Sequence, residues 1–308
     1  ASIIEIPNSA GNHSSPFITP NSEYLVAGTR FSIPMGTDAQ RDVPIETYKE
    51  NFKGTVSFIK PDTATSTMSI AFQITTPAVD FDLAHAGKGP SDGWFFFSCY
   101  NTEQAYSLLE VNASQRDKDF IMAVNWKKAE QYAKEGKGKM IDGKHYMNHY
   151  DESVHSATSK VVDQVLQLDP KELTDLLYFM PCPKSPHGCD VDPTGEFIVG
   201  SGKLAATLPV FSFTKMQKAI ADKDFDGDFV GIPVLKYESV LHGEVKKPGL
   251  GPLHTEFDNN GFAYSSMFVS SEIVKWNVKS LEVVDRVPTY YSIGHLCVPG
   301  GDSKQPWG

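Results

Sequence analysis

The sequence predicts an all-β fold, an incomplete β-propeller of about four to five blades with short peripheral helices. Three observations favour this fold class. A short unit, in which a histidine precedes a turn and a strand, recurs along the chain. Successive units are separated by distances that bracket or exceed the ~40–50 residues of a four-stranded blade. Much of the remaining chain reads as short apolar segments bounded by Gly, Pro, Asn and Asp, which is typical of strands and turns.

The recurring unit begins at a histidine in four places: His13, His187, His254 and His295. In the first three places a turn follows within 7 to 9 residues, and a strand follows the turn. The last three histidines are separated by 67 and 41 residues. Radial repetition brings equivalent positions of different blades to one axis, so we expect these imidazoles to converge. Converging imidazoles are typical ligands of a transition metal.

The other segments are assigned in chain order. Strands are expected at 54–59, 68–74 and 94–100. Short helices are expected at 127–134, 170–179 and 211–221. The second helix is predicted because Asp169 and Pro170 resemble an N-cap followed by proline at the first helical position.

The remaining histidines show no metal-binding pattern. His85 precedes the glycine of another turn by eight residues, but the alanine and glycine around it indicate a flexible loop. His145, His149 and His155 lie between two expected helices, where no cysteine is near. We interpret these three as part of a surface insertion, and the sequence assigns them no role.

Composition limits the possible partners. The chain has 308 residues, 40% of them hydrophobic, and a formal net charge of −10. The absence of a long basic run argues against nucleic acid and anionic membranes as partners. No apolar stretch approaches ~18 residues, so no transmembrane helix is predicted. The chain has neither an initiating methionine nor a signal peptide, and we interpret it as a piece of a longer protein.

Four cysteines form no C-x-x-C pair: Cys99, Cys182, Cys189 and Cys297. Cys182 and Cys189 flank His187 and would bridge only in an oxidising compartment. The alternative is that all four are small buried residues. The sequence leaves this choice open.

An acidic segment at 100–117 carries Glu103, Glu110 and Asp117. Carboxylates and backbone carbonyls in an irregular loop are typical ligands of a hard cation such as calcium. A solvated acidic face is the alternative, and the residues alone do not separate the two.

Five stretches of the chain resemble the nitrous oxide reductases, copper enzymes of denitrifying bacteria. These stretches are IPNSAGNHSSPF at 6–17, CYNTEQAYSLLEVNASQRD at 99–117, CPKSPHGCDVDPTGEFIVGSGKL at 182–204, GLGPLHTEFDNNGFAYSSMFVSSEIVKW at 249–276 and YYSIGHLCVPGGDSKQPWG at 290–308. They follow one another in the family's order and span almost the whole chain. The last one is similar to the Sec-exported branch of the family.

The resemblance implies a seven-bladed propeller followed by a cupredoxin-like domain with a dinuclear copper centre. Residues 1–308 would then be part of the N-terminal propeller, and the cupredoxin domain would be absent. The family's propeller carries a tetranuclear copper–sulfide cluster held by seven histidines. Four of these match His13, His187, His254 and His295. The family's other three ligands fall outside residues 1–308.

The resemblance also implies a calcium site and a second shell around the cluster. Calcium ligands match the carbonyls of Tyr100 and Val111 and the carboxylates of Glu103 and Asp117. The family's remaining calcium ligand is an asparagine, and Ser185 stands in its place. Asp82 matches an aspartate of the second shell, where a carboxylate orients a ligand or a bound water.

The function implied is the reduction of N2O to N2 and water, the last step of denitrification, in the periplasm. The implied electron donor is a cytochrome or cupredoxin acting through the second copper domain, and the implied full-length protein is a homodimer. The 308-residue chain alone is expected to be inactive. Two alternatives are a calcium-binding propeller that serves as a scaffold or interaction module, and a propeller hydrolase with one axial calcium. The hydrolase would need axial carboxylates where histidines stand.

Overall fold

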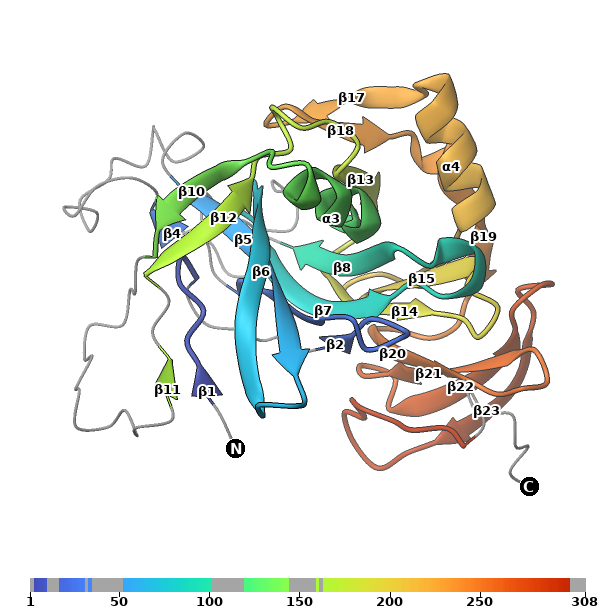
Figure 1. Cartoon of the computed structure of the whole chain (residues 1–308). Helices are drawn as coiled ribbons and strands as arrows, with labels where there is room; N and C mark the ends of the chain where they lie inside the picture. Colours follow the sequence, from blue (N-terminus) through green and yellow to red (C-terminus); the bar gives the residue numbers. More distant parts are fainter. Residues whose placement is uncertain are drawn as a thin grey trace. The chain divides into compact units, whose positions relative to one another are not determined.

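The computed structural model in Figure 1 describes residues 3–9, 17–30, 33–34, 52–100, 119–143, 159–160 and 163–299. These residues form mainly strands, joined by a few short helices. The chain divides into two compact units. The first comprises Ala1–Phe81, Thr102–Gln104 and Asn125–Leu177, and the second comprises Asp82–Asn101, Ala105–Val124 and Tyr178–Gly308. The mainly-β composition and the short helices confirm the coarse prediction, whereas an incomplete seven-bladed propeller of about four to five blades stays a prediction.

The first unit contains a seven-stranded sheet. Its strands in spatial order are β10 (Lys139–Asp142), β12 (Gln164–Leu168), β6 (Thr67–Thr76), β5 (Phe52–Asp62), β3 (Leu25–Gly28) and β2 (Phe17–Ile18), with β4 (Ile33–Pro34) also paired to β5. A separate parallel pair joins β1 (Ile3–Ile4) to β11 (Ser159–Lys160). The helix α3 (Trp126–Lys134) begins at Asn125, whose side chain accepts a hydrogen bond from the Lys128 N–H. This helix was expected at 127–134.

Aromatic side chains form the core of the first unit. Phe58 and Phe72 lie opposite one another on β5 and β6 and stack with ring centroids 4.8 Å apart. Tyr24 and Trp126 pack edge-on beside them, with their centroids 5.9 Å apart. Edge-to-face and offset aromatic pairs stabilise a core beyond the area that they bury.

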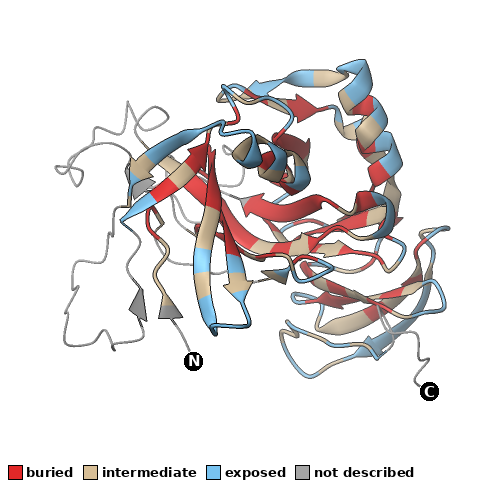
Figure 2. Ribbon diagram, viewed as in Figure 1, coloured by how far each residue is buried: buried red, intermediate tan, exposed pale blue. Residues whose placement is uncertain are grey.

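The second unit begins with a six-stranded sheet. Its order is β17 (Phe225–Phe229), β18 (Ile232–Leu235), β13 (Leu177–Pro181), β9 (Phe120–Asn125), β8 (Trp94–Tyr100) and β7 (Asp80–Ala86). A short 3-10 helix, η3 (Gly89–Ser91), joins β7 to β8. Figure 2 shows the central strands of this sheet as almost wholly buried, in agreement with the unbroken apolar runs of β9 and β13.

Two four-stranded antiparallel sheets follow, each running in sequence order. The first is β14 (Pro186–Val191), β15 (Phe197–Gly202), β16 (Thr207–Ser212) and β19 (Leu241–Lys246). The second is β20 (Pro252–Phe257), β21 (Phe262–Met267), β22 (Glu272–Asn277) and β23 (Val283–Pro288). Each opens with a hairpin whose turn ends at a glycine of positive φ, 75° at Gly195 and 83° at Gly261. The predicted unit of histidine, turn and strand is confirmed in both sheets.

Two helices lie between β16 and β19, α4 (Phe213–Asp222) and α5 (Tyr237–Val240). The first confirms the helix expected at 211–221. It begins at Ser212, whose hydroxyl oxygen accepts a hydrogen bond from the Lys215 N–H and thereby satisfies one free backbone donor of the first turn. None of the helices among the described residues is both long and apolar enough to cross a membrane.

The helix expected at 170–179 is wrong. Asp169 does cap a turn, because its carboxylate accepts a hydrogen bond from the Lys171 N–H at 2.9 Å. The chain then enters β13 at Leu177, and four successive residues of that strand are buried. A continuous apolar run that is buried on both faces forms a strand, whereas a helix would have exposed one side.

The cysteines of the second unit are free thiols. Cys99, Cys182 and Cys189 are buried, and Cys297 is exposed. Burial raises the pKa of the Cys182 and Cys189 thiols well above the usual value. The alternative of small buried residues therefore holds for three of the four, and Cys182 and Cys189 form no bridge.

Candidate metal centre

Three edge strands of the second unit meet at the candidate site. They are β7, β14 and β20, each the outermost strand of its sheet. The approach of β14 to β20 depends on Gly188, because a Cβ there would lie 2.1 Å from the carbonyl oxygen of Leu253. Only a residue without a side chain permits this contact. The close approach places the neighbouring residues, His187 and His254, side by side.

Both histidines lie at β-bulges. On β14, Pro186 pairs with Gly202 and Gly188 pairs with Ser201, so two steps along β14 match one step along β15. The register therefore shifts at His187. On β20, Pro252 pairs with Met267 and Thr255 pairs with Ser265, so three steps along β20 match two steps along β21. The register therefore shifts at Leu253–His254. A bulge re-aims the side chains that it carries and is common beside active sites.

The imidazoles of His187 and His254 face one another through their Nε2 atoms, which are 3.1 Å apart. Their rings are nearly perpendicular, at 88°, with centroids 4.8 Å apart. His295 follows β23 in the chain, and its ring stacks on that of His254 with a centroid separation of 4.1 Å and a tilt of 36°. The structure thus brings three of the four predicted histidines together.

Asp82 fixes the orientation of His187. Its Oδ2 lies 2.5 Å from the Nδ1 of His187, and its side chain is only 2% exposed. A carboxylate in this position holds the proton on Nδ1, so the Nε2 lone pair of His187 is directed at His254. The family resemblance implies a place for Asp82 beside a metal cluster, and that role stays a prediction.

His254 is a neutral imidazole at pH 7. Burial lowers its pKa to about 4, and the neighbouring His187 and His295 lower it further, whereas Asp190 and Asp82 oppose the shift. A neutral imidazole keeps the lone pair that a metal needs.

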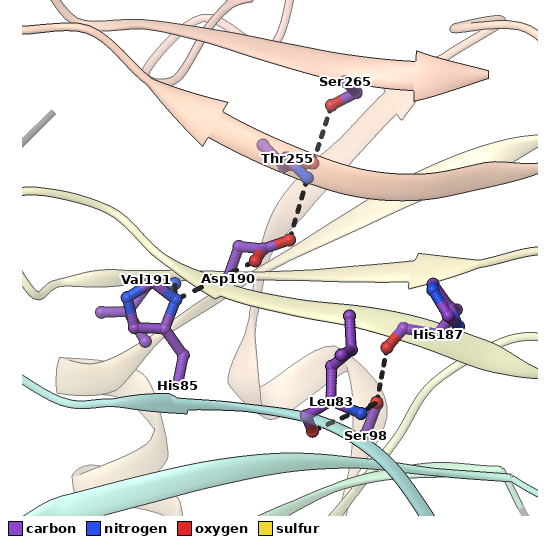
Figure 3. A network of polar contacts seen from close by, with 8 residues as sticks. All are labelled: Leu83, His85, Ser98, His187, Asp190, Val191, Thr255 and Ser265. Carbon is purple, nitrogen blue, oxygen red and sulfur yellow. Dashed lines mark hydrogen bonds and ion pairs between the residues drawn. The ribbon is translucent and has the colours of Figure 1, made fainter. Parts of the chain in front are cut away.

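Buried serines hold the backbone of both histidines. The Ser98 hydroxyl donates to the carbonyl oxygen of His187 at 2.6 Å and accepts from the Leu83 N–H at 2.9 Å, as Figure 3 shows. The hydroxyl of Ser266 accepts from the N–H of His254 at 3.2 Å. These bonds satisfy backbone groups that the bulges remove from the regular ladder.

The imidazoles of His187 and His254 are spaced as ligands of one first-row transition metal would be. The imidazole of His295 is adjacent, but it is stacked on His254. Nitrogens bound to one tetrahedral metal at about 2.0 Å lie roughly 3.3 Å apart, close to the 3.1 Å between the Nε2 atoms of His187 and His254. Within the described ranges, no three His, Cys, Asp or Glu side chains are arranged to hold one ion. The stacking of His295 on His254 is consistent with this finding.

Of the other predicted site residues, the structure describes Ser185 and the backbone of Tyr100. Ser185 is fully buried, and its N–H donates to Asp119 Oδ2 at 2.6 Å. Tyr100 is the last residue of β8, and its side chain is not among those described. The described residues do not include His13, Glu103, Val111, Asp117, His145, His149 or His155.

The expectation of a flexible loop at His85 is wrong. His85 lies in β7, and the irregular stretch begins only after Ala86. The segment 80–83 alternates polar and apolar residues, which is typical of a strand and could have indicated that the chain is extended here. His85 belongs to a second polar network that sequence reasoning missed.

Comparison with known proteins identifies distant relatives. No family model matches the sequence. The chain is 27% identical over 279 residues to a nitrous-oxide reductase of Pseudomonas fluorescens, covering 90% of this chain and 37% of that protein. It is 26% identical over 305 residues to a nitrous-oxide reductase of Stutzerimonas stutzeri, covering 96% of this chain and 42% of that protein. A nitrous-oxide reductase of Ralstonia nicotianae is 30% identical over 216 residues, covering 64% and 28%.

Solved structures of similar shape show low sequence identity. A hydrazine synthase of Kuenenia stuttgartiensis has a TM-score of 0.47 at 12% identity, covering 84% of this chain and 57% of that chain. The periplasmic gluconolactonase PpgL of Pseudomonas aeruginosa has a TM-score of 0.47 at 12% identity, covering 91% and 58%. At this level the similarity carries no argument about the site. The chain spans about two fifths of the length of the first two nitrous-oxide reductases, and it is distantly related to them.

Proposed function

We propose that the chain is part of a copper-dependent nitrous oxide reductase, which converts N2O, two protons and two electrons into N2 and water. The observation that carries the proposal is the meeting of His187, His254 and His295, which three separate segments of the chain contribute. The distant relation to nitrous-oxide reductases supports the same reading.

In this proposal His187, His254 and His295 bind copper, together with His13. Imidazole nitrogen suits copper in either oxidation state. When bound, a multi-copper cluster supplies the two electrons and a Lewis acid for the oxygen that leaves N2O. The ring of His295 must then turn out of its stack on His254 so that the three imidazoles share one centre.

The remaining residues of the site orient its ligands. Asp82 holds the Nδ1 proton of His187 and so directs the Nε2 atom of that ring. Burial keeps His254 neutral and ready to bind. The histidines act as ligands, and no acid or base role is assigned to them.

The finer parts of the proposal rest on the family resemblance. They are calcium at Tyr100, Glu103, Val111 and Asp117, a periplasmic location, and a homodimer. Electrons would arrive from a cytochrome or cupredoxin through a dinuclear copper domain. The alternative of a calcium-binding scaffold gains no support from any residue that the structure describes.

The test compares the natural protein that contains these residues with its His187→Ala and His254→Ala variants. We expect the unaltered protein to contain several copper ions and to reduce N2O, and both variants to lose the copper together with the activity. His242→Ala is the matched control, because His242 lies on β19, where it contacts the carbonyl of Lys279 and the ring of Phe197. An unaltered protein that contains calcium but no copper would contradict the proposal.

A further inference from the structure

A second set of polar contacts joins the same three edge strands (Figure 3). It consists of His85 on β7, Asp190 on β14 and Thr255 on β20. These residues follow Asp82, His187 and His254 by three, three and one positions. Each strand therefore contributes one residue to the candidate metal centre and one to this network.

Asp190 connects two sheets. Its Oδ2 accepts a hydrogen bond from the backbone N–H of Thr255 at 2.9 Å, and its side chain is 15% exposed. Thr255 is 2% exposed and belongs to a different sheet. A buried N–H that leaves the regular ladder needs another acceptor, and Asp190 supplies it from the neighbouring edge strand.

The N–H that Asp190 binds belongs to the bulge that carries His254. The register of β20 resumes at Thr255, the residue that follows His254. Side chains satisfy both consecutive N–H groups, Ser266 for His254 and Asp190 for Thr255. The position of the His254 ring therefore depends on where Asp190 holds the chain.

His85 supports Asp190 from the third strand. Its Nδ1 accepts a hydrogen bond from the N–H of Val191 at 3.3 Å, so this nitrogen carries no proton. The same atom lies 3.9 Å from Asp190 Oδ1, which is contact without a hydrogen bond. His85 thus packs against the carboxylate and binds the backbone that follows it.

Thr255 is also fixed within its own sheet. Its hydroxyl lies 2.7 Å from that of Ser265, which accepts a hydrogen bond from the indole N–H of Trp276 at 2.9 Å. Asp190 therefore binds a rigid point of the second four-stranded sheet, and it couples that sheet to β14.

We propose that Asp190, supported by His85, is a positioning residue that fixes the bulge at His254 and so holds the His254 ring at His187. Its contact with Thr255 determines the separation of the two Nε2 atoms. The copper measurements below rest on the proposed function, whereas the separation of the imidazoles does not.

The experiment uses the natural protein that contains these residues, with Asp190→Ala and Asp190→Asn. Crystal structures of the metal-free proteins measure the Nε2–Nε2 separation. We expect Asp190→Ala to increase it by more than about 0.5 Å, the tolerance of a functional constellation. Asp190→Asn should retain it, because the amide oxygen still accepts from the Thr255 N–H. Copper affinity should fall about ten-fold in Asp190→Ala, with a changed absorption spectrum.

Asp192→Ala is the matched control for stability. Among the described residues, the carboxylate of Asp192 accepts hydrogen bonds from Thr194 and Phe197, in the turn of its own hairpin. We expect this variant to lose stability without a change in the imidazole separation or in the copper spectrum.

The outcomes are distinguishable. The positioning role is overturned if Asp190→Ala keeps the separation at its original value, or if Asp190→Asn changes it as much as Asp190→Ala does. If Asp190→Ala does not fold, Asp190→Glu decides, because it keeps the charge and displaces the carboxylate by one methylene. An unchanged separation in that variant overturns the role. An unaltered protein that holds the two imidazoles together but takes up no copper defeats the proposed function and leaves the positioning role intact.

Discussion

Gly188 lies where β14 and β20 come closest, and its missing side chain leaves room for the carbonyl of Leu253. The two histidines beside this contact meet at 3.1 Å. Asp82 then selects the nitrogen of His187 that faces His254. At the scale of single residues, the site thus depends on Gly188, which lets the two strands approach, and on Asp82, which orients the His187 ring.

Gly188→Ala should separate the two edge strands. Its Cβ would lie 2.1 Å from a backbone oxygen, which has no flexible end to move aside. Such overpacking costs about 1–3 kcal/mol, measurable by urea denaturation. Gly294→Ala is the control, because a Cβ there meets nothing within 4 Å. Equal stability of the two variants would show that the strands adjust without cost.

The neutral state of His254 predicts a pH dependence of the metal-free protein. Its folded pKa of about 4 lies below the ordinary value of 6.5, so the unfolded state binds more protons between these two values. The contribution of His254 to the free energy of unfolding should be fully present above pH 6.5 and should be lost as the pH decreases toward 4.

The decrease in the free energy of unfolding is at most about 3 kcal/mol, and screening by solvent at the partly exposed ring of His254 reduces it. Urea denaturation at pH 7 and at pH 4.5 measures it, and His254→Gln should remove part of the difference. An identical pH profile in that variant would contradict the assignment.

At the scale of elements, the histidines of the site lie on the edge strands β14 and β20. The bulges at His187 and His254 occupy equivalent places in two successive sheets, at the edge strand before each hairpin turn. The hairpin partners β15 and β21 pair regularly with the strands that follow them, so the local shift re-aims only a few side chains. Rigid strands therefore hold a site whose geometry is set by their irregular positions.

The helix α4 depends on its cap. Ser212 accepts from the Lys215 N–H and donates to Glu196, which also binds Thr214. Ser212→Ala should lower the free energy of unfolding by about 1 kcal/mol, as measured by urea denaturation. Ser280→Ala, at an exposed turn, should change it by less than about 0.5 kcal/mol. A Ser212→Ala protein as stable as this control would show that the cap contributes nothing.

The sequence made many of the strands and turns predictable, together with the positions of His187 and His254 before their turns, because these are local properties. Glycine at 195 and 261 signals a turn of positive φ, and the histidines precede those turns at a nearly constant distance. The bulges and the contact of Asp190 with Thr255 were not predictable, because they depend on the neighbouring sheet. The helix expected at 170–179 failed for a similar reason, since burial on both faces is a tertiary property.

At the scale of the whole molecule, the chain spans about two fifths of the length of the nitrous-oxide reductases that it matches. Four candidate ligands lie in residues 1–308, and the family resemblance implies seven. We expect residues 1–308, expressed alone, to reduce no N2O. Loss of ligands and of the groups that orient them lowers metal affinity steeply.

Gas chromatography of N2 formed with a chemical reductant measures this outcome, and the natural protein that contains these residues is the positive control. Copper-dependent N2 production by residues 1–308 would contradict the expectation.

Two edge strands of the candidate site, β14 and β20, are each joined by a hydrogen bond to the sheet that precedes them. Ser98 on β8 binds the backbone of β14, and Asp190 on β14 binds the backbone of β20. The sheets are therefore not exchangeable modules, although those that open with β14 and β20 each look like a complete four-stranded repeat. A sheet that is duplicated or transplanted would bring its histidine and leave behind the neighbour that aims it. Evolution and protein engineering must then change these sheets in adjacent pairs, with the hydrogen-bonding side chain in one and the histidine in the next.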